Sequence, residues 1–230
     1  MTIHVARGQA NKAGRVLRTI DMTDSVSQNQ KDAIITATRW RSQHVKATET
    51  CFSTVLDCAS AIDGTVATYR MKRMTSIIRK LQRPSSHLKL GELDDIGGCR
   101  LIVNTIDDVN TATDILKNRL SLKNGNGDKN YIDSPQQSGY RSRHLIAKIN
   151  EEETCLHVEI QIRTRLQHCW ATANAAMGKY ILRNTKARKY KATRVGQTLK
   201  GLSSSQLSPA CSRFMRAHHR FRDIRNPKNR

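Results

Sequence analysis

The stretch that decides the fold runs from Tyr140 to Thr164, reading Y-R-S-R-H-L-I-A-K-I, a short acidic break, and then C-L-H-V-E-I-Q-I-R-T. Apolar and polar residues alternate in both halves, which is the period of a half-buried β-strand. The break at residues 150–154 has the composition of a turn. We therefore predict two adjacent antiparallel strands joined by a polar turn.

The second of these strands is predicted to have one apolar and one charged face. Ile160 and Ile162 fall on one side, and Glu159, Gln161 and Arg163 on the other, because successive side chains of a strand point to opposite faces. A carboxylate, an amide and a guanidinium cost free energy when they are buried. This face is either solvated or the floor of a site for a charged ligand, and we favour the second interpretation.

The rest of the chain predicts helices and further strands around this pair. Apolar spacings of three and four residues indicate helices over 9–20, 30–44, 48–61, 75–81, 107–116 and 164–182. Strand composition appears at 65–71 and 100–104. The resulting order favours an α+β fold, a mixed β-sheet flanked by helices. We expect a helical N-terminal segment at 1–64, the main domain at 65–182, and a basic, poorly ordered tail at 183–230.

The charge balance points to a polyanionic partner. The chain has 40 Lys and Arg against 19 Asp and Glu, a formal charge of +21, and residues 181–230 carry 14 of the basic residues with one acidic residue. Such an excess is typical of proteins that bind nucleotides, nucleic acids or anionic surfaces. The six cysteines show no C-x-x-C pair, and no apolar run is long enough to cross a membrane. We expect a cytoplasmic protein with reduced thiols and no membrane partner.

Two clusters before residue 105 have the chemistry of a phosphate site. The first contains basic residues around a predicted helix start, which suits a phosphate chain: Arg70, Lys72, Arg73, Ser76 and Lys80. The second is L-D-D-I-G-G-C-R, in which Asp95 precedes a predicted buried strand, a common place to hold Mg²⁺. The alternatives are a solvated helix end and a turn aspartate that bonds its own backbone.

Two further clusters lie in and before the opening stretch. Lys129, Arg141, Arg143 and His144 surround Tyr140, a combination that can stack a base and hold its phosphates. The alternative is an exposed loop anchored by its tyrosine. In E-I-Q-I-R-T, Glu159 could share a metal with Asp95 or take a proton from an attacking hydroxyl, and the alternative is a strand face that meets solvent.

Taken together, these residues resemble a known family. R-M-K-R-M-T-S-I-I-R-K-L, D-I-G-G-C-R, K-N-Y-I-x-x-P, S-G-Y-R-S-R-H and E-I-Q-I-R-T occur in the order and approximate spacing of the RelA/SpoT-type (p)ppGpp synthetase domain, from about Thr65 to Tyr180. The segments A-N-K-A-G-R-V-L, W-R-S-Q-H and W-A-T-A-N-A-A-M-G look closer to its single-domain members, the small alarmone synthetases and toxin-like relatives.

The resemblance implies a nucleotidyltransferase-like fold and the transfer of pyrophosphate from ATP to a ribose 3′-hydroxyl with Mg²⁺. It also implies roles for matching residues. Asp95 and Glu159 would be catalytic and bind the metal, with Gln161 and Arg163 in support. ATP would be held by Arg70, Lys72, Ser76, Lys80 and Arg100, and the acceptor guanosine nucleotide by Lys129, Tyr140 and His144.

The sequence departs from the family pattern at the acceptor side. The family's Pro-Lys is Pro135-Gln136 here, the Asn before Gly-Tyr is Ser138, and the Glu-His pair of the final helix is Asn174-Ala175. The family's His-Asp hydrolase domain has no counterpart, so we expect no alarmone hydrolysis. The leading hypothesis is synthesis of (p)ppGpp from ATP and GDP or GTP. The alternatives are a toxin-like pyrophosphokinase that acts on the tRNA 3′ end and has an antitoxin partner, and an inactive basic RNA-binding remnant.

Overall fold

The computed structural model describes residues 4–20, 25–84, 87–151 and 154–184. The chain divides into two compact units, one of residues 1–136 with 140–171 and one of residues 137–139 with 172–230. The first unit contains every strand of the described ranges. The described part of the second consists of residues 137–139 and the later turns of the last helix. The expected poorly ordered tail lies outside the described residues from 185 onward.

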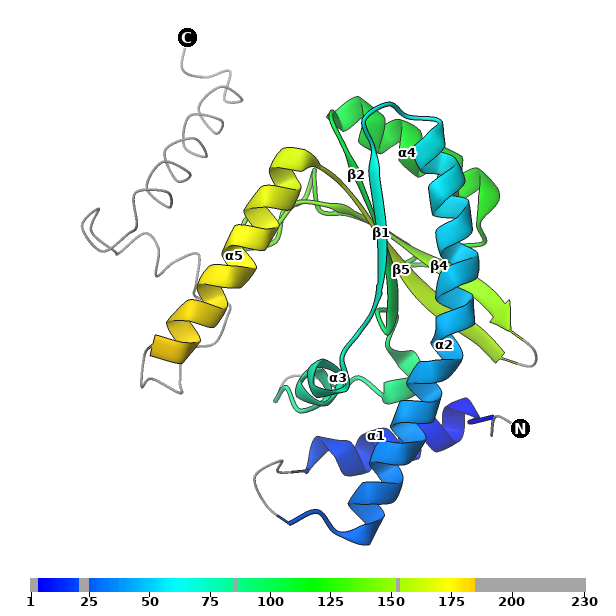
Figure 1. Cartoon of the computed structure of the whole chain (residues 1–230), viewed down its shortest axis with the longest axis vertical. Coiled ribbons are helices and arrows are strands. Elements are labelled where there is room, and N and C mark those ends of the chain that lie inside the picture. The colour runs from blue at the N-terminus through cyan, green and yellow to red at the C-terminus, as the bar shows by residue number, and fades with distance from the viewer. Residues whose placement is uncertain (1–3, 21–24, 85–86, 152–153, 185–230) are drawn as a thin grey trace. The chain divides into compact units, whose positions relative to one another are not determined.

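The first unit is built on a mixed β-sheet, as the sequence predicted (Figure 1). Its order is β1-β2-β5-β4-β3, with β2 and β5 parallel and the other pairs antiparallel. The opening stretch forms the expected antiparallel pair β4 and β5. The short edge strand β3 was not predicted. The strands are β1 (Val66–Met71), β2 (Gly97–Val103), β3 (Asp128–Asn130), β4 (Arg143–Glu151) and β5 (Thr154–Thr164).

The helices follow the predicted periodicity, with one exception. The structure has a single helix of 33 residues where we expected two. No glycine or proline interrupts this segment, and Ser27 and Gln30 form a capping box at its start. The helices are α1 (Arg7–Arg18), α2 (Gln28–Ser60), α3 (Met74–Leu81), α4 (Ile106–Arg119) and α5 (Arg165–Asn184), with a 3₁₀ turn at Leu90–Glu92.

Helices α2 and α4 cover the apolar face of the sheet (Figure 1). Ile160 and Ile162 lie on this face and are fully buried, as the alternation predicted. Gly97 lets α2 come close, because a Cβ atom at this position would lie 2.0 Å from Thr48 Oγ1. Helix α1 packs against α2 and the 3₁₀ turn. The opposite face of the sheet is thereby left to polar residues.

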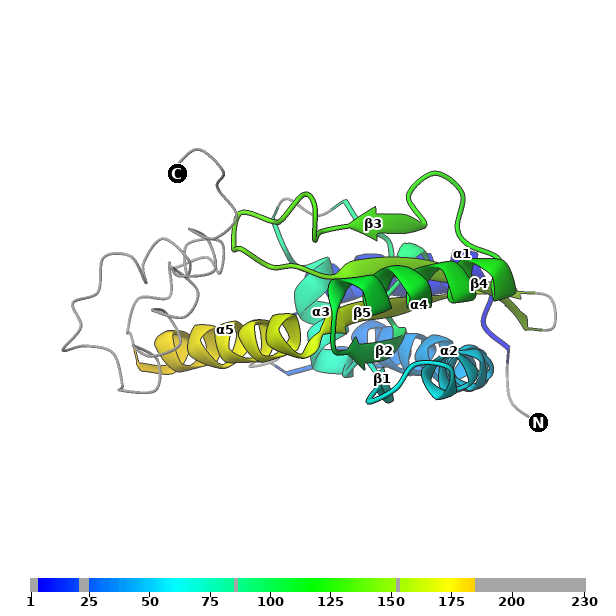
Figure 2. The same ribbon diagram turned by 90° about the horizontal axis from the view of Figure 1, so that it is seen from above.

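Figure 2 gives a second view, from above, in which β1, β2, β5, β4 and β3 follow one another across the sheet. Among the described residues, no helix is long and apolar enough to cross a membrane.

Candidate active site

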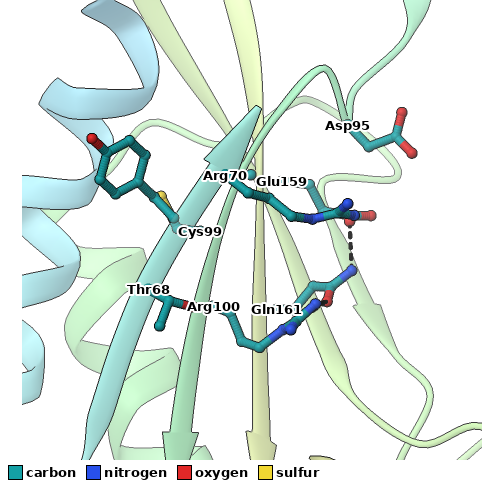
Figure 3. Close-up of a pocket in the computed structure, with 9 residues that line it drawn as sticks. Thr68, Arg70, Asp95, Cys99, Arg100, Glu159 and Gln161 are labelled. Carbon is teal, nitrogen blue, oxygen red and sulfur yellow. Dashed lines mark hydrogen bonds between the residues drawn. The ribbon is translucent and has the colours of Figure 1, made fainter. Parts of the chain in front are cut away.

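The strand register brings the predicted residues together on the polar face of the sheet. Arg70, Gly98 and Glu159 form one row across β1, β2 and β5, and Thr68, Arg100 and Gln161 form the next. The side chains of Arg70, Glu159, Arg100 and Gln161 point to the same side in Figure 3. A pocket at these rows is lined by Thr68, Tyr69, Arg70, Asp95, Gly98, Cys99, Arg100, Glu159 and Gln161.

Asp95 lies in the turn before β2 and is held by two lysines. Lys72 Nζ lies 2.6 Å from its Oδ2, and Lys80 Nζ lies 2.9 Å from its Oδ1. The backbone fixes this arrangement, because the N–H of Lys72 donates to the carbonyl of Ile96 at 2.8 Å. Burial raises the pKa of Asp95, but Lys80 and Lys72 outweigh it and hold the pKa below the usual value. The carboxylate is therefore ionised at neutral pH.

Glu159 is tied to β4 and to its own strand. His144 Nδ1 lies 3.1 Å from its Oε1, and Gln161 Nε2 donates to its Oε2 at 2.8 Å. Burial raises the pKa of Glu159, and the contacts with His144 and Gln161 lower it further than burial raises it. Because the carboxylate can only accept, His144 carries its proton on Nδ1, and its Nε2 can accept from the Tyr140 hydroxyl at 2.8 Å.

Three aromatic rings meet beside Glu159. The ring centroids of Tyr140 and His144 lie 5.7 Å apart, and Tyr131 lies 5.1 Å from His144 and 6.2 Å from Tyr140. Burial raises the pKa of Tyr140, so its hydroxyl stays protonated. The sequence interpretation missed Tyr131 as part of this group, although it lies within the quoted K-N-Y-I segment.

Guanidinium groups gather on one side of the polar face, where Arg70 and Arg100 line the pocket and Arg163 lies near Arg100 outside its lining. Arg100 Nη2 donates to Gln161 Oε1 at 3.1 Å. Arg163 is only 3% exposed, and its Nε has no hydrogen-bond partner among the described residues. Burial lowers the pKa of Arg163 to about 10, and the nearby Arg100 adds to this effect. This cationic side has the character of an anion site.

Five of the predicted residues line the pocket, and seven do not: Lys72, Ser76, Lys80, Lys129, Tyr140, His144 and Arg163. Ser76 lies half-buried in the first turn of α3, and Lys129 lies on β3 opposite His144. The sequence interpretation also missed an ion-pair cluster next to Asp95. Asp94 Oδ1 lies 2.7 Å from His157 Nδ1 and 2.9 Å from Lys123 Nζ. The strand period could have indicated His157, since it shares a face with Glu159.

The acidic residues fit a metal that a substrate helps to hold. Within the described residues, no group of three or more His, Cys, Asp or Glu side chains could form a protein-only metal site. Asp95 and Glu159 nevertheless line the same pocket, and the buried Asp95 carboxylate has Lys72 and Lys80 as its partners. Mg²⁺ in phosphate chemistry takes one or two carboxylates together with substrate phosphates. Two carboxylates in a cationic pocket meet that requirement.

This chain belongs to the family described as the region found in RelA/SpoT proteins, whose model matches residues 69–194, more than half of the chain. Among curated proteins it is similar to the GTP pyrophosphokinases YwaC and YjbM of Bacillus subtilis, each 34% identical over 111 residues. The matches cover 45% and 46% of this chain and 52% of each relative, so the chain spans about half the length of the curated relatives it matches.

Solved structures share the fold. The small alarmone synthetase 1 of Bacillus subtilis has a TM-score of 0.55 and 24% identity, and the match covers 81% of this chain and 95% of that one. A GTP pyrophosphokinase family protein of Streptococcus pneumoniae has a TM-score of 0.53 and 24% identity, over 70% and 88% of the two chains. The predicted RelA/SpoT resemblance and nucleotidyltransferase-like fold are confirmed.

Proposed function

We propose that this chain transfers the pyrophosphate group of ATP to the ribose 3′-hydroxyl of GDP or GTP, which yields (p)ppGpp and AMP. The observation that carries the proposal is the single pocket in which two carboxylates, Asp95 and Glu159, face the guanidinium groups of Arg70 and Arg100. Phosphoryl transfer depends mainly on positioning and charge neutralisation, which this arrangement supplies. The family and the names of the curated relatives support the same reaction.

ATP would occupy the side of the pocket formed by β1, β2 and α3. In this proposal Arg70 contacts the adenine, and the triphosphate lies near Lys72, Ser76 and Lys80. Arg100 supports the same side. Lysine ammonium groups and free N–H groups at a helix start suit a phosphate chain. Lys72 and Lys80 already meet at one carboxylate, so both lie within reach of the same anionic group.

The acceptor would occupy the side formed by β3 and β4. Tyr140 would stack on the guanine, and Lys129 and His144 would lie near the phosphates. The cluster of Tyr131, Tyr140 and His144 rings provides an aromatic surface next to Glu159. An acceptor base there would bring its ribose towards the carboxylate.

Glu159 would hold or accept the proton of the 3′-hydroxyl. The acceptor oxygen forms a bond to the β-phosphorus of ATP, and the bond from that phosphorus to the bridging α-phosphate oxygen breaks. AMP leaves with the bonding electrons. Asp95 and Glu159 would hold Mg²⁺, which supplies neutralisation of the phosphate charge when it is bound. The lowered pKa of Glu159 keeps it ionised and able to accept.

The test offers γ-labelled ATP and Mg²⁺ with GDP, GTP or bulk tRNA. We expect label on the guanosine nucleotide, and a loss of about 10²–10⁴-fold in rate for Glu159→Gln. Glu151→Gln is the matched control, because Glu151 pairs with Lys46 outside the pocket and its loss should leave the rate unchanged. No transfer to any acceptor, or an equal effect of both variants, would refute the proposal.

A tRNA 3′ end is the second candidate acceptor. Gln136 stands where the family has lysine, and the loss of that cation weakens the case for a small acceptor that depends on protein contacts to its phosphates. A tRNA would use a broad basic surface instead. Label on tRNA but not on GDP or GTP, with the same Glu159 dependence, would favour this acceptor.

A further inference from the structure

Both acidic residues of the pocket are engaged by protein groups in this structure. The two ammonium groups of Lys72 and Lys80 lie 2.6 and 2.9 Å from the two oxygens of Asp95. The two oxygens of Glu159 face His144 and Gln161 at 3.1 and 2.8 Å. Each of the four carboxylate oxygens therefore has a protein cation or donor within 3.1 Å.

The Asp95 ion pairs are shielded from water. The side chains of Lys72, Lys80 and Asp95 are 14%, 20% and 18% exposed. Attraction and repulsion between charges are screened less in such a place than at the surface. A divalent ion bound to Asp95 would lie next to both ammonium groups and be repelled by them. The guanidinium groups of Arg70 and Arg100 line the same pocket and add to this repulsion.

A bound nucleoside triphosphate makes metal binding at Asp95 favourable. Its phosphate oxygens offer Lys72 and Lys80 a stronger anion than one carboxylate, and they offer the metal oxygen ligands of their own. We propose that the two lysines block Asp95 until a triphosphate draws them away, so that the divalent metal enters the site with the nucleotide and not before it. This inference rests on the function proposed above and adds an order of binding to it.

The order of binding can be measured with Mn²⁺ as the probe. The relaxation rate of water protons rises when Mn²⁺ is bound to a protein, and this readout does not depend on turnover. We titrate the full chain with Mn²⁺ alone, and again with an ATP analogue that has a methylene group between the α- and β-phosphates. We expect the analogue to tighten Mn²⁺ binding to the protein by at least about tenfold, because it draws the two ammonium groups away and adds phosphate ligands to the metal.

Lysine variants test whether the two ammonium groups cause the block. Lys72→Met and Lys80→Met should each strengthen Mn²⁺ binding to the nucleotide-free protein by several-fold, and adding Asp95→Asn should abolish the gain. Lys117→Met is the matched control, because it removes a lysine that pairs with Asp128 away from the pocket. It should leave Mn²⁺ binding unchanged. Circular dichroism checks that each variant is folded.

The outcomes separate this inference from the proposed function. If nucleotide-free wild-type protein binds Mn²⁺ as tightly as the complex does, while still binding the analogue, the order of binding is wrong and the function stands. If the lysine variants bind Mn²⁺ no better than Lys117→Met, the lysines do not block the site. If the analogue does not bind with or without Mn²⁺, the proposed function itself fails. The wild-type comparison remains decisive if a variant does not fold.

Discussion

A single added methyl group at Gly97 should separate α2 from the sheet. The Cβ of Gly97→Ala would lie 2.0 Å from Thr48 Oγ1 and 3.2 Å from Thr48 Cβ, whereas ordinary contact begins at about 3.4 Å. Thr48 is fully buried, and its hydroxyl donates to the carbonyl of His44 at 2.6 Å. The hydroxyl therefore cannot turn away without losing a buried hydrogen bond.

The cost follows from what must move. Relieving the overlap requires a shift of more than 1 Å, through a strained Thr48 rotamer at about 0.5–1.5 kcal/mol or the loss of its hydrogen bond at about 1 kcal/mol. If both occur, the cost is about 1.5–2.5 kcal/mol, which lies within the roughly 1–3 kcal/mol range for overpacked cores. We expect Gly97→Ala to lower the free energy of unfolding by about 2 kcal/mol.

Urea unfolding followed by circular dichroism measures this loss, and two variants serve as controls. Gly98→Ala adds the same atom on the opposite face, where it meets only Glu159 O at 3.4 Å, so stability should change by less than about 0.5 kcal/mol. The double variant with Thr48→Ala and Gly97→Ala should lose less free energy of unfolding than the sum of the losses of the two single variants. Wild-type stability for Gly97→Ala, or no coupling with Thr48, would contradict this prediction.

Two further predictions concern the polar face, and a third concerns the edge strand β3. Tyr140→Phe keeps the ring but removes the hydroxyl partner of His144. We therefore expect a lower kcat with a nearly unchanged KM for GTP. A KM that rises by the same factor as kcat falls would contradict this. Arg163→Met removes a buried guanidinium whose Nε has no hydrogen-bond partner among the described residues, so unfolding in urea should be no easier than in the wild type while transfer falls. Asp128→Asn should cost about 1 kcal/mol at neutral pH, because burial raises the pKa of Asp128 but Arg143 and other partners lower it below the usual value. A group with a lowered pKa stabilises the fold above its unfolded pKa, so the difference from the wild type should disappear as the pH falls below about 4.

Periodicity predicted those parts of the fold in which a single pattern runs uninterrupted. The alternation around Glu159 determined which side chains of β5 are buried, and this was correct for Ile160 and Ile162. The division of α2 into two helices was wrong because its apolar spacing weakens near Val45, which is exposed, although the backbone continues without a helix breaker. Strand β3 has only three residues, too few for a period to appear.

The sequence predicted which residues lie together in the pocket only where the order of the motifs indicated it. The sequence grouped Asp95 with Glu159, and both line one pocket. The contacts of Lys72 and Lys80 with Asp95 could not be predicted, because they depend on where α3 lies relative to the turn before β2. The cluster of Asp94, Lys123 and His157 joins segments far apart in the sequence, and no local pattern records such ion pairs.

The two adjacent glycines in D-I-G-G-C-R both need to lack a side chain, but for different reasons. Gly97 faces α2, where an added Cβ has no room, whereas Gly98 faces the pocket between Arg70 and Glu159 in the strand register. A side chain at Gly98 would stand in the row where a ligand must meet both charges. Substitutions at Gly97 should therefore lower the stability of the fold, and substitutions at Gly98 should weaken nucleotide binding. We expect Gly98→Val to fold but not to bind an ATP analogue. Unchanged binding would mean that the nucleotide lies elsewhere.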